Sequence, residues 1–278
     1  MAYTAEISRS NPSCFLFLID QSGSMADSFG GDLGKSKADS VADAINRLLQ
    51  NLVIKCAKSE GVRDYYYVGV VGYGAVVGPA FSGPLAGQEL IPISQIANMP
   101  ARIEERTRKV DDGAGGLVDQ RIKFPIWFDP IANGGTPMCQ ALSIAKRIIE
   151  NWINQHPDCF PPIVINITDG EATDGDPSFN VEEIKRLSTN DGNVLLFNAH
   201  LSSTRANPIE FPDSSTELPD QFARLLFNMS STLPPYMQDA AKLEGYKITE
   251  NSRGFVFNAD IISVIRFLDI GTRPSNLR

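Results

Sequence analysis

The sequence predicts an α/β fold with a doubly wound, mostly parallel central sheet and helices on both faces of that sheet. Short apolar segments alternate along the chain with longer segments whose apolar residues recur at helical spacing. This alternation is typical of parallel strands joined by crossover helices. One strand candidate, Pro161 to Thr168, is apolar almost throughout, as expected for a parallel strand that is covered on both faces.

The first part of the chain contributes two predicted strands and the helix between them. The first strand is roughly Cys14 to Asp20, and the second is Tyr65 to Tyr73. A glycine-rich loop at residues 27–34 leads from the first strand into the helix. The apolar residues of this helix share one face, namely Val41, Ile45, Leu48, Leu49, Leu52 and Cys56.

Residues 75–130 contain Gly and Pro and are predicted to be largely irregular. Two short strands are expected there, at 76–81 and 88–93. The segment from 102 to 109 mixes both signs of charge, so we expect it to form a solvated helix face. The aromatic run at 123–129 follows. Its aromatic side chains could line a partner surface, but packing in the core is the favoured interpretation.

The second half of the chain begins with a helix at Thr136. Pro137 suits the first turn of a helix, and Thr136 is the predicted N-cap. After the strand ending at Thr168, we expect a short helix at Val181 to Leu187 and a strand at Asn193 to Leu201. The remaining predicted elements are helices at 220–228 and 235–243, a strand at 254–258, and a closing helix at 260–268 that is capped by Asp260.

The whole chain, residues 1–278, is expected to form a single domain. Its 278 residues, 42% of them hydrophobic, are enough for a sizeable core. Apolar residues persist through the two irregular stretches at about 95–130 and 202–235. These stretches are therefore interpreted as insertions into one domain and not as linkers.

Composition argues against nucleic-acid and membrane partners. The net charge is −8, and no basic residues cluster into the kind of face that nucleic acid requires. No apolar stretch approaches the roughly 20 residues of a membrane helix, and the first residues lack the apolar core of a signal peptide. We therefore expect a cytoplasmic protein with small, buried and unpaired thiols, at Cys14, Cys56, Cys139 and Cys159.

Oxygen-bearing side chains follow two of the predicted strands and precede one predicted helix. The first strand runs into Asp20-Gln21-Ser22-Gly23-Ser24, and the strand ending at Thr168 is followed by Asp169. The carboxyl ends of parallel strands meet at one edge of a sheet, and the helix start at Thr136 faces the same edge. Hydroxyl and carboxylate oxygens are ligands for Mg²⁺ or Mn²⁺. The candidate metal site is Asp20, Ser22, Ser24, Thr136 and Asp169.

More acidic residues lie near this candidate site in the sequence. Asp129 precedes the Gly134-Gly135-Thr136 segment and could reach the site. Glu171, Asp174 and Asp176 follow Asp169, and we expect them to form a solvated loop.

The five candidate residues resemble the metal-ion-dependent adhesion site of von Willebrand factor A (VWA) domains. That site combines Asp-x-Ser-x-Ser with a Thr and a further Asp, and no position is missing here. The resemblance implies a Rossmann-like VWA fold with Ser22 and Ser24 as direct ligands and Thr136 bound directly or through water. It also implies that Asp20 and Asp169 orient waters and balance charge. In the family, an Asp or Glu of a partner protein fills the open coordination position.

The resemblance therefore implies a metal-dependent adapter that binds proteins and is not an enzyme. Among VWA proteins the sequence is similar to the bacterial tellurite-resistance-associated (TerY-type) group. That similarity implies a protein kinase and a PP2C-like phosphatase as partners, in a stress-response or phage-defence module. The likeness does not extend to residues 95–130 or 202–235, and the long loop after Met25 departs from the family pattern.

A nucleotide-binding enzyme is the first alternative. Residues 30–36 nearly match a phosphate-binding P-loop, but the required first glycine is Phe29 in this chain. The segment also lies well beyond Asp20, whereas a P-loop follows its strand directly. No GxGxxG is present in the first turn, which disfavours a dinucleotide site.

A metal-dependent phosphotransferase or hydrolase is the second alternative, with Asp20 as the nucleophile. In haloacid-dehalogenase-like phosphatases a second Asp stands two residues later, where this chain has Ser22. The two histidines, His156 and His200, belong to no recognisable triad or zinc motif. The sequence therefore favours an interaction module.

Overall fold

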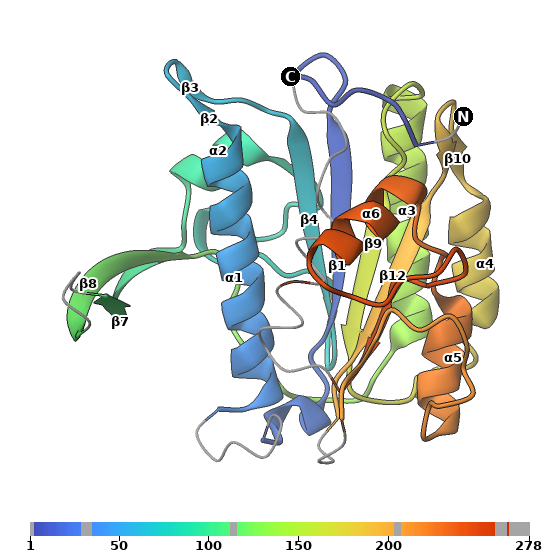
Figure 1. Cartoon of the computed structure of the whole chain (residues 1–278). Coiled ribbons are helices and arrows are strands. Elements are labelled where there is room, and N and C mark those ends of the chain that lie inside the picture. Colours follow the sequence, from blue (N-terminus) through green and yellow to red (C-terminus); the bar gives the residue numbers. More distant parts are fainter. Residues whose placement is uncertain (1–2, 29–34, 112–115, 203–206, 259–265, 267–278) are drawn as a thin grey trace.

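The computed structural model describes residues 3–28, 35–111, 116–202, 207–258 and residue 266 (Figure 1). Two sequence predictions fall largely outside these ranges. They are the closing helix at 260–268 and the near P-loop at 30–36, together with most of the glycine-rich loop that contains it.

An eight-stranded sheet forms the centre of the described part of the chain. Its parallel strands follow the order β4-β1-β9-β12-β14 and are β1 (Ser13–Asp20), β4 (Tyr66–Tyr73), β9 (Ile163–Thr168), β12 (Leu195–His200) and β14 (Phe255–Phe257). Short antiparallel strands complete the edges, namely β5 (Val77–Pro79), β6 (Ile91–Pro92) and β13 (Ile209–Glu210). The predicted, mostly parallel sheet is confirmed.

Helices cover both faces of this sheet, as predicted (Figure 1). Side chains of β1 alternate between the two cores, with Phe15, Phe17 and Ile19 on one side and Leu16 and Leu18 on the other. The first core is closed by α1 (Lys37–Cys56), α2 (Ile93–Asn98) and α6 (Pro235–Leu243). The second core is closed by α3 (Met138–Gln155), α4 (Ser178–Arg186) and α5 (Gln221–Met229).

Small elements connect these layers. Two 3₁₀ turns are η1 (Gly23–Ala26) and η2 (Gly83–Leu85). Two short hairpins are formed by β2 (Ala57–Lys58) with β3 (Gly61–Val62), and by β10 (Ser188–Thr189) with β11 (Gly192–Asn193). No helix among the described residues combines the length and the apolar character needed to cross a bilayer.

The helix predicted at residues 102–109 is wrong, because this segment is strand β7 (Arg102–Asp111), paired with β8 (Leu117–Ile126). Its charges pair at a spacing of two, since Glu104 bonds both Arg102 and Arg106 on one side of the strand. The pairing partner is a later segment, β8, whose apolar residues alternate only toward its end, from Ile122 to Ile126. The hairpin projects from the body of the molecule (Figure 1).

The aromatic run at the base of this hairpin packs in the core, as expected. Phe124, Ile126, Trp127 and Phe128 are each at most 3% exposed. The Trp127 ring N–H donates to the Ile96 carbonyl oxygen at 2.6 Å. These aromatic side chains therefore cannot contact a partner directly.

The cysteines are free thiols. Cys14, Cys56 and Cys159 are buried as predicted, whereas Cys139 is half-buried near the start of α3. Burial raises the pKa of the Cys56 thiol to about 12 and that of Cys159 to about 11. These two thiols therefore stay neutral at physiological pH.

Candidate metal centre

The candidate site lies where the strand order reverses. β1 and β9 are neighbours and run parallel, with Ile19 opposite Ile167. The chain leaves β1 toward β4 on one side and returns to β9 on the other. Asp20 is the last residue of β1, and Asp169 directly follows β9. In open α/β sheets such a switch point forms a crevice outside the carboxyl ends of the strands.

Asp20 holds the turn that carries the two serines. Its carboxylate accepts the backbone N–H of Ser22 at 2.8 Å and the hydroxyl of Thr168 at 2.6 Å. Asp20 is 1% exposed. Burial raises the pKa of Asp20, and the neighbouring charge of Asp169 adds to this, while the hydrogen bonds from Thr168 and Ser22 oppose it.

Three oxygen-bearing side chains lie next to one another at this switch point. The hydroxyl oxygens of Ser22 and Ser24 are 3.0 Å apart, and the Ser24 hydroxyl donates to Oδ1 of Asp169 at 2.7 Å. Ser22 is buried, whereas Ser24 is exposed. The structure therefore brings Ser22, Ser24 and Asp169 together, with Asp20 directly behind them.

The loop that carries Thr136 packs against the serine turn. The Gly23 N–H donates to the Gly134 carbonyl oxygen at 3.0 Å, and the Asn133 N–H donates to the Gln21 carbonyl oxygen at 2.7 Å. Gly134 has φ +82°, and a side chain there would collide with the backbone of Ala75. Glycine at 134 thus allows the loop that carries Thr136 to lie close against the turn after β4.

Thr136 is buried beside this contact and is held through its backbone. Its N–H donates to the hydroxyl of Thr173 at 3.0 Å, and its carbonyl oxygen accepts the Thr173 N–H at 2.9 Å. Within the described residues, no hydrogen bond joins the Thr136 hydroxyl to Ser22, Ser24 or Asp169. The structure therefore places Thr136 in the loop that packs against the serine turn, outside the hydrogen-bonded cluster.

The predicted N-cap role of Thr136 is wrong. Helix α3 begins at Met138, and Pro137 stands at the N-cap without a side-chain bond. The Asp174 carboxylate satisfies the first turn instead, accepting the N–H groups of Cys139 and Gln140 at 3.0 and 2.9 Å. A carboxylate from a remote loop replaced the local cap, so Asp174 has a structural role beyond a solvated loop.

Asp129 does not reach the site. Its carboxylate pairs with Arg102 at 2.6 Å at the base of the hairpin. Asp176, by contrast, lies in the loop after β9, where it accepts the Ser178 N–H at 2.9 Å.

Sequence reasoning missed Lys37. This first residue of α1 reaches the cluster, where its ammonium lies 2.7 Å from Oδ2 of Asp169. Both side chains are almost fully buried, at 3% and 1% exposed. The sequence feature that could have revealed Lys37 is a lysine at the start of a helix, where the positive end of the helix dipole disfavours a cation.

The oxygen spacing fits a small divalent cation. An octahedral Mg²⁺ site has neighbouring ligand oxygens about 2.9 Å apart, and the two measured separations are 3.0 and 2.7 Å. A cation could thus bind between these oxygens with little movement of the side chains, the hydroxyl groups keeping their protons and turning them away from the cation. Among the described residues, no group of three or more His, Cys, Asp and Glu side chains is placed to bind a metal, so hydroxyl ligands would be essential.

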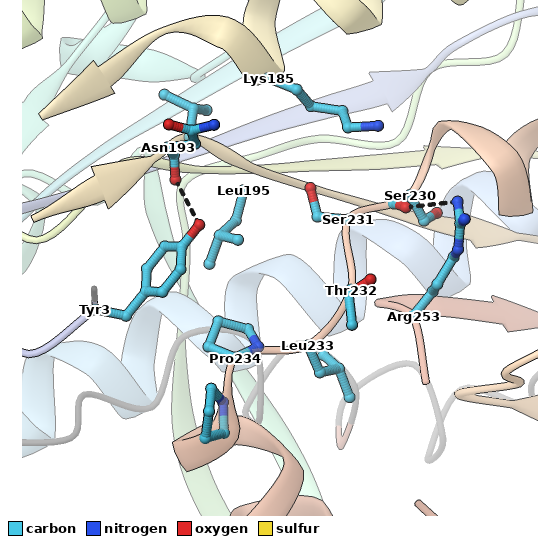
Figure 2. Close-up of a pocket in the computed structure, with 12 residues that line it drawn as sticks. Tyr3, Lys185, Asn193, Leu195, Ser230, Ser231, Thr232, Leu233, Pro234 and Arg253 are labelled. Atoms are coloured by element: carbon cyan, nitrogen blue, oxygen red, sulfur yellow. Dashed lines mark hydrogen bonds between the residues drawn. The ribbon is translucent and has the colours of Figure 1, made fainter. Parts of the chain in front are cut away.

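A separate cavity of about 410 Å³ opens at the amino-terminal edge of the sheet (Figure 2). Several of its polar groups have structural partners. Tyr3 donates to the Asn193 carbonyl oxygen at 3.1 Å, and the Ser231 hydroxyl accepts the Leu196 N–H at 3.0 Å. Arg253 donates to the carbonyl oxygens at the end of α5. This cavity is distant from the candidate site and shares no residue with it.

No protein-family model matches the sequence, and no curated protein matches it. Solved structures with partial likeness include a von Willebrand factor type A protein from Catenulispora acidiphila, at 18% identity and a TM-score of 0.39 over 68% of this chain and 33% of that one. Another is the ArnB paralog VWA2 from Sulfolobus acidocaldarius, at 13% identity and a TM-score of 0.36 over 68% and 35% of the two chains.

A third is the vWF domain of the type V pili tip protein Mfa5 from Porphyromonas gingivalis, at 17% identity and a TM-score of 0.33 over 58% and 39% of the two chains. This chain therefore covers only about a third of the length of the first two structures. Sequence identities and TM-scores as low as these do not assign the chain to a family.

Proposed function

We propose that this chain is a VWA-like protein-binding domain whose candidate metal centre holds Mg²⁺ or Mn²⁺ and docks an Asp or Glu of a partner protein. The observation that carries the proposal is the continuous run of oxygens from Ser22 through Ser24 to Asp169 at the switch point of the sheet. Thr136 and Asp20 complete the set that the sequence motif predicts.

Each residue has a distinct part in this proposal. Ser22 and Ser24 offer neutral hydroxyl oxygens, and Asp169 offers a carboxylate. Asp20 fixes the turn by its bond to the Ser22 N–H. The bound cation would supply positive charge for an incoming carboxylate. That charge matters because the chain carries a net charge of −8, which would otherwise repel an acidic partner.

The environment of Asp20 favours an interaction module over a phosphotransferase or hydrolase. A carboxylate nucleophile needs a free oxygen that faces the substrate. Both oxygens of Asp20 accept hydrogen bonds, and the residue is 1% exposed. Asp20 is therefore poorly placed for attack, and a non-enzymatic role is the better interpretation.

The finer placement of the protein rests on the sequence resemblance alone. On that resemblance, the protein is proposed to be a TerY-type adapter in a bacterial stress-response, tellurite-resistance or phage-defence module. A protein kinase and a PP2C-like phosphatase are the proposed partners, and the location is the cytoplasm. Nucleic acid and membranes are not among the proposed partners.

A pull-down from the native host in Mg²⁺ and in EDTA tests the docking. Ser24→Ala is the informative variant, because Ser24 is exposed and its loss should leave the fold intact. Ser59→Ala is the matched control, since Ser59 is an exposed serine in the turn between β2 and β3.

We expect a partner that wild type and Ser59→Ala retain in Mg²⁺ only and that Ser24→Ala does not retain. The same partners in Mg²⁺ and EDTA for all three proteins would contradict metal-dependent docking.

A further inference from the structure

Lys37 places a second kind of cation at the candidate metal centre. Its ammonium lies 2.7 Å from Oδ2 of Asp169, while the Ser24 hydroxyl occupies Oδ1 of the same carboxylate. The next carboxylate, Asp27, is 4.0 Å from the ammonium and 64% exposed. Asp169 is therefore the principal counter-ion of Lys37.

Burial and the helix dipole both disfavour a charged lysine at position 37, and only the ion pair with Asp169 favours it. Lysine is almost never fully buried unless it is paired, because its ammonium loses hydration. The first turn of a helix also disfavours positive charge. Lys37 is nevertheless 3% exposed and is the first residue of α1. The attraction of Asp169 is what accounts for its placement.

The start of α1 is built to hold Lys37 in place. Ser36 is the N-cap, and its hydroxyl accepts the Asp39 N–H at 3.0 Å. Asp39 in turn accepts the Ser36 N–H at 3.2 Å, which completes a capping box. The Lys37 N–H donates to the Asp27 carbonyl oxygen at 2.9 Å. These bonds fix the backbone from which the lysine reaches Asp169.

We propose that Lys37 is a built-in counter-ion that competes with the divalent cation for Asp169 and so weakens the affinity of the site for that cation. The inference rests on the proposed function. The formal charges of Asp20, Asp169 and Lys37 sum to minus one. A divalent cation would leave the loaded centre with one positive charge, whereas a centre without Lys37 would be neutral.

This residual charge links cation binding to docking. A carboxylate from a partner would neutralise the loaded centre, so the cation and the acidic residue stabilise each other's binding. Without an acidic ligand, Lys37 satisfies Asp169 and the cation is held weakly. Lys37 thus makes occupancy of the site depend on the partner.

Titration with Mn²⁺ alone, by calorimetry, tests this competition in the full chain. Lys37→Met removes the charge and keeps an unbranched apolar stem. Lys35→Met is the matched control, because it removes the same charge from a lysine that is 60% exposed and pairs with Asp43. We expect Lys37→Met to bind Mn²⁺ at least about tenfold more tightly than wild type, and Lys35→Met to change affinity by about twofold or less.

Thermal unfolding in EDTA gives a second readout. Lys37→Met should lower the Tm, because Asp169 loses its buried partner, and adding Asp169→Asn should restore part of that loss. Mn²⁺ should raise the Tm of Lys37→Met more than that of wild type. If Lys37→Met does not fold in EDTA, Mn²⁺ should restore its folding.

The outcomes separate this inference from the proposed function. Equal or weaker Mn²⁺ affinity in Lys37→Met, with wild type still binding Mn²⁺, overturns the role of Lys37 and leaves the metal site standing. Failure of Mn²⁺ to fold an unstable Lys37→Met likewise overturns the inference. No Mn²⁺ binding by either protein overturns both the inference and the proposed metal site.

Discussion

Asn46 fastens the base of the β7–β8 hairpin to helix α1, and its replacement should be among the most damaging single changes in the protein. Its side-chain oxygen accepts the N–H groups of Trp127 and Phe128 at 2.8 and 3.1 Å. Its side-chain nitrogen donates to the carbonyl oxygens of Ala42 and Phe128, both at 2.8 Å. Asn46 is 1% exposed.

The loss can be worked out from these four bonds. Asn46→Ala would leave two backbone N–H groups and one carbonyl of Trp127 and Phe128 without a partner, in residues at most 2% exposed. Each buried unpaired group costs about 1–3 kcal/mol. Because such terms are not fully additive, we expect a loss of about 3–5 kcal/mol in the free energy of unfolding.

Urea unfolding of wild type, Asn46→Ala and Asn51→Ala measures this loss. Asn51 is an exposed asparagine on the same helix, so its change should stay within about 0.5 kcal/mol. The midpoint for Asn46→Ala should fall with an unchanged m-value. A loss below about 1 kcal/mol would refute the reasoning, because it would mean that water or a shift of the hairpin satisfies the released groups.

Three further predictions concern the surroundings of the site. Asp174→Ala should lower the free energy of unfolding by about 1 kcal/mol in urea, because the first turn of α3 loses its only side-chain acceptor among the described residues. Gly134→Ala should cost more than Gly78→Ala, because Gly134, unlike Gly78, combines a positive φ with a backbone collision, and thermal unfolding compares the two variants. Burial lowers the pKa of His200, although the charges of Asp220 and Asp169 oppose this effect. The native imidazole then stays neutral while the unfolded chain, with a pKa near 6.5, gains a proton. The free energy of unfolding should therefore fall as the pH drops below about 6.5, by up to about 1.4 kcal/mol per pH unit. Urea unfolding at pH 7.5 and 5.5 should show a smaller fall in His200→Gln than in wild type, and an equal fall would contradict this assignment.

Most strands of the sheet and most helices that cover it were predictable from the sequence, because the patterns that indicate them are local. β9 is a mostly apolar run, and α3 shows its buried face at helical spacing. Their order also placed Asp20 and Asp169 at one edge of the sheet, since parallel strands bring their carboxyl ends together. The structure places both acids and the two serines at this edge, and their role as metal ligands stays a prediction.

The missed features depend on partners that are distant in the sequence. Residues 102–109 are read as a helix face when only their charges are considered, because the pairing of β7 with β8 lies across the loop that joins the two strands. The cap of α3 comes from Asp174, 35 residues beyond Cys139. Lys37 meets Asp169 across 132 residues. Local propensity cannot reveal such contacts, and only packing of the whole chain brings them together.

The most direct test of the account is whether Ser22, Ser24 and Asp169 hold one divalent cation. Electron paramagnetic resonance counts free Mn²⁺ during a titration of wild type, Ser24→Ala and the control Ser59→Ala. We predict a single Mn²⁺ per chain for wild type and the control, and an affinity at least about tenfold weaker in Ser24→Ala, because a ligand has been removed. No Mn²⁺ binding by wild type and Lys37→Met alike, or equal affinity in wild type and Ser24→Ala, would contradict the central claim.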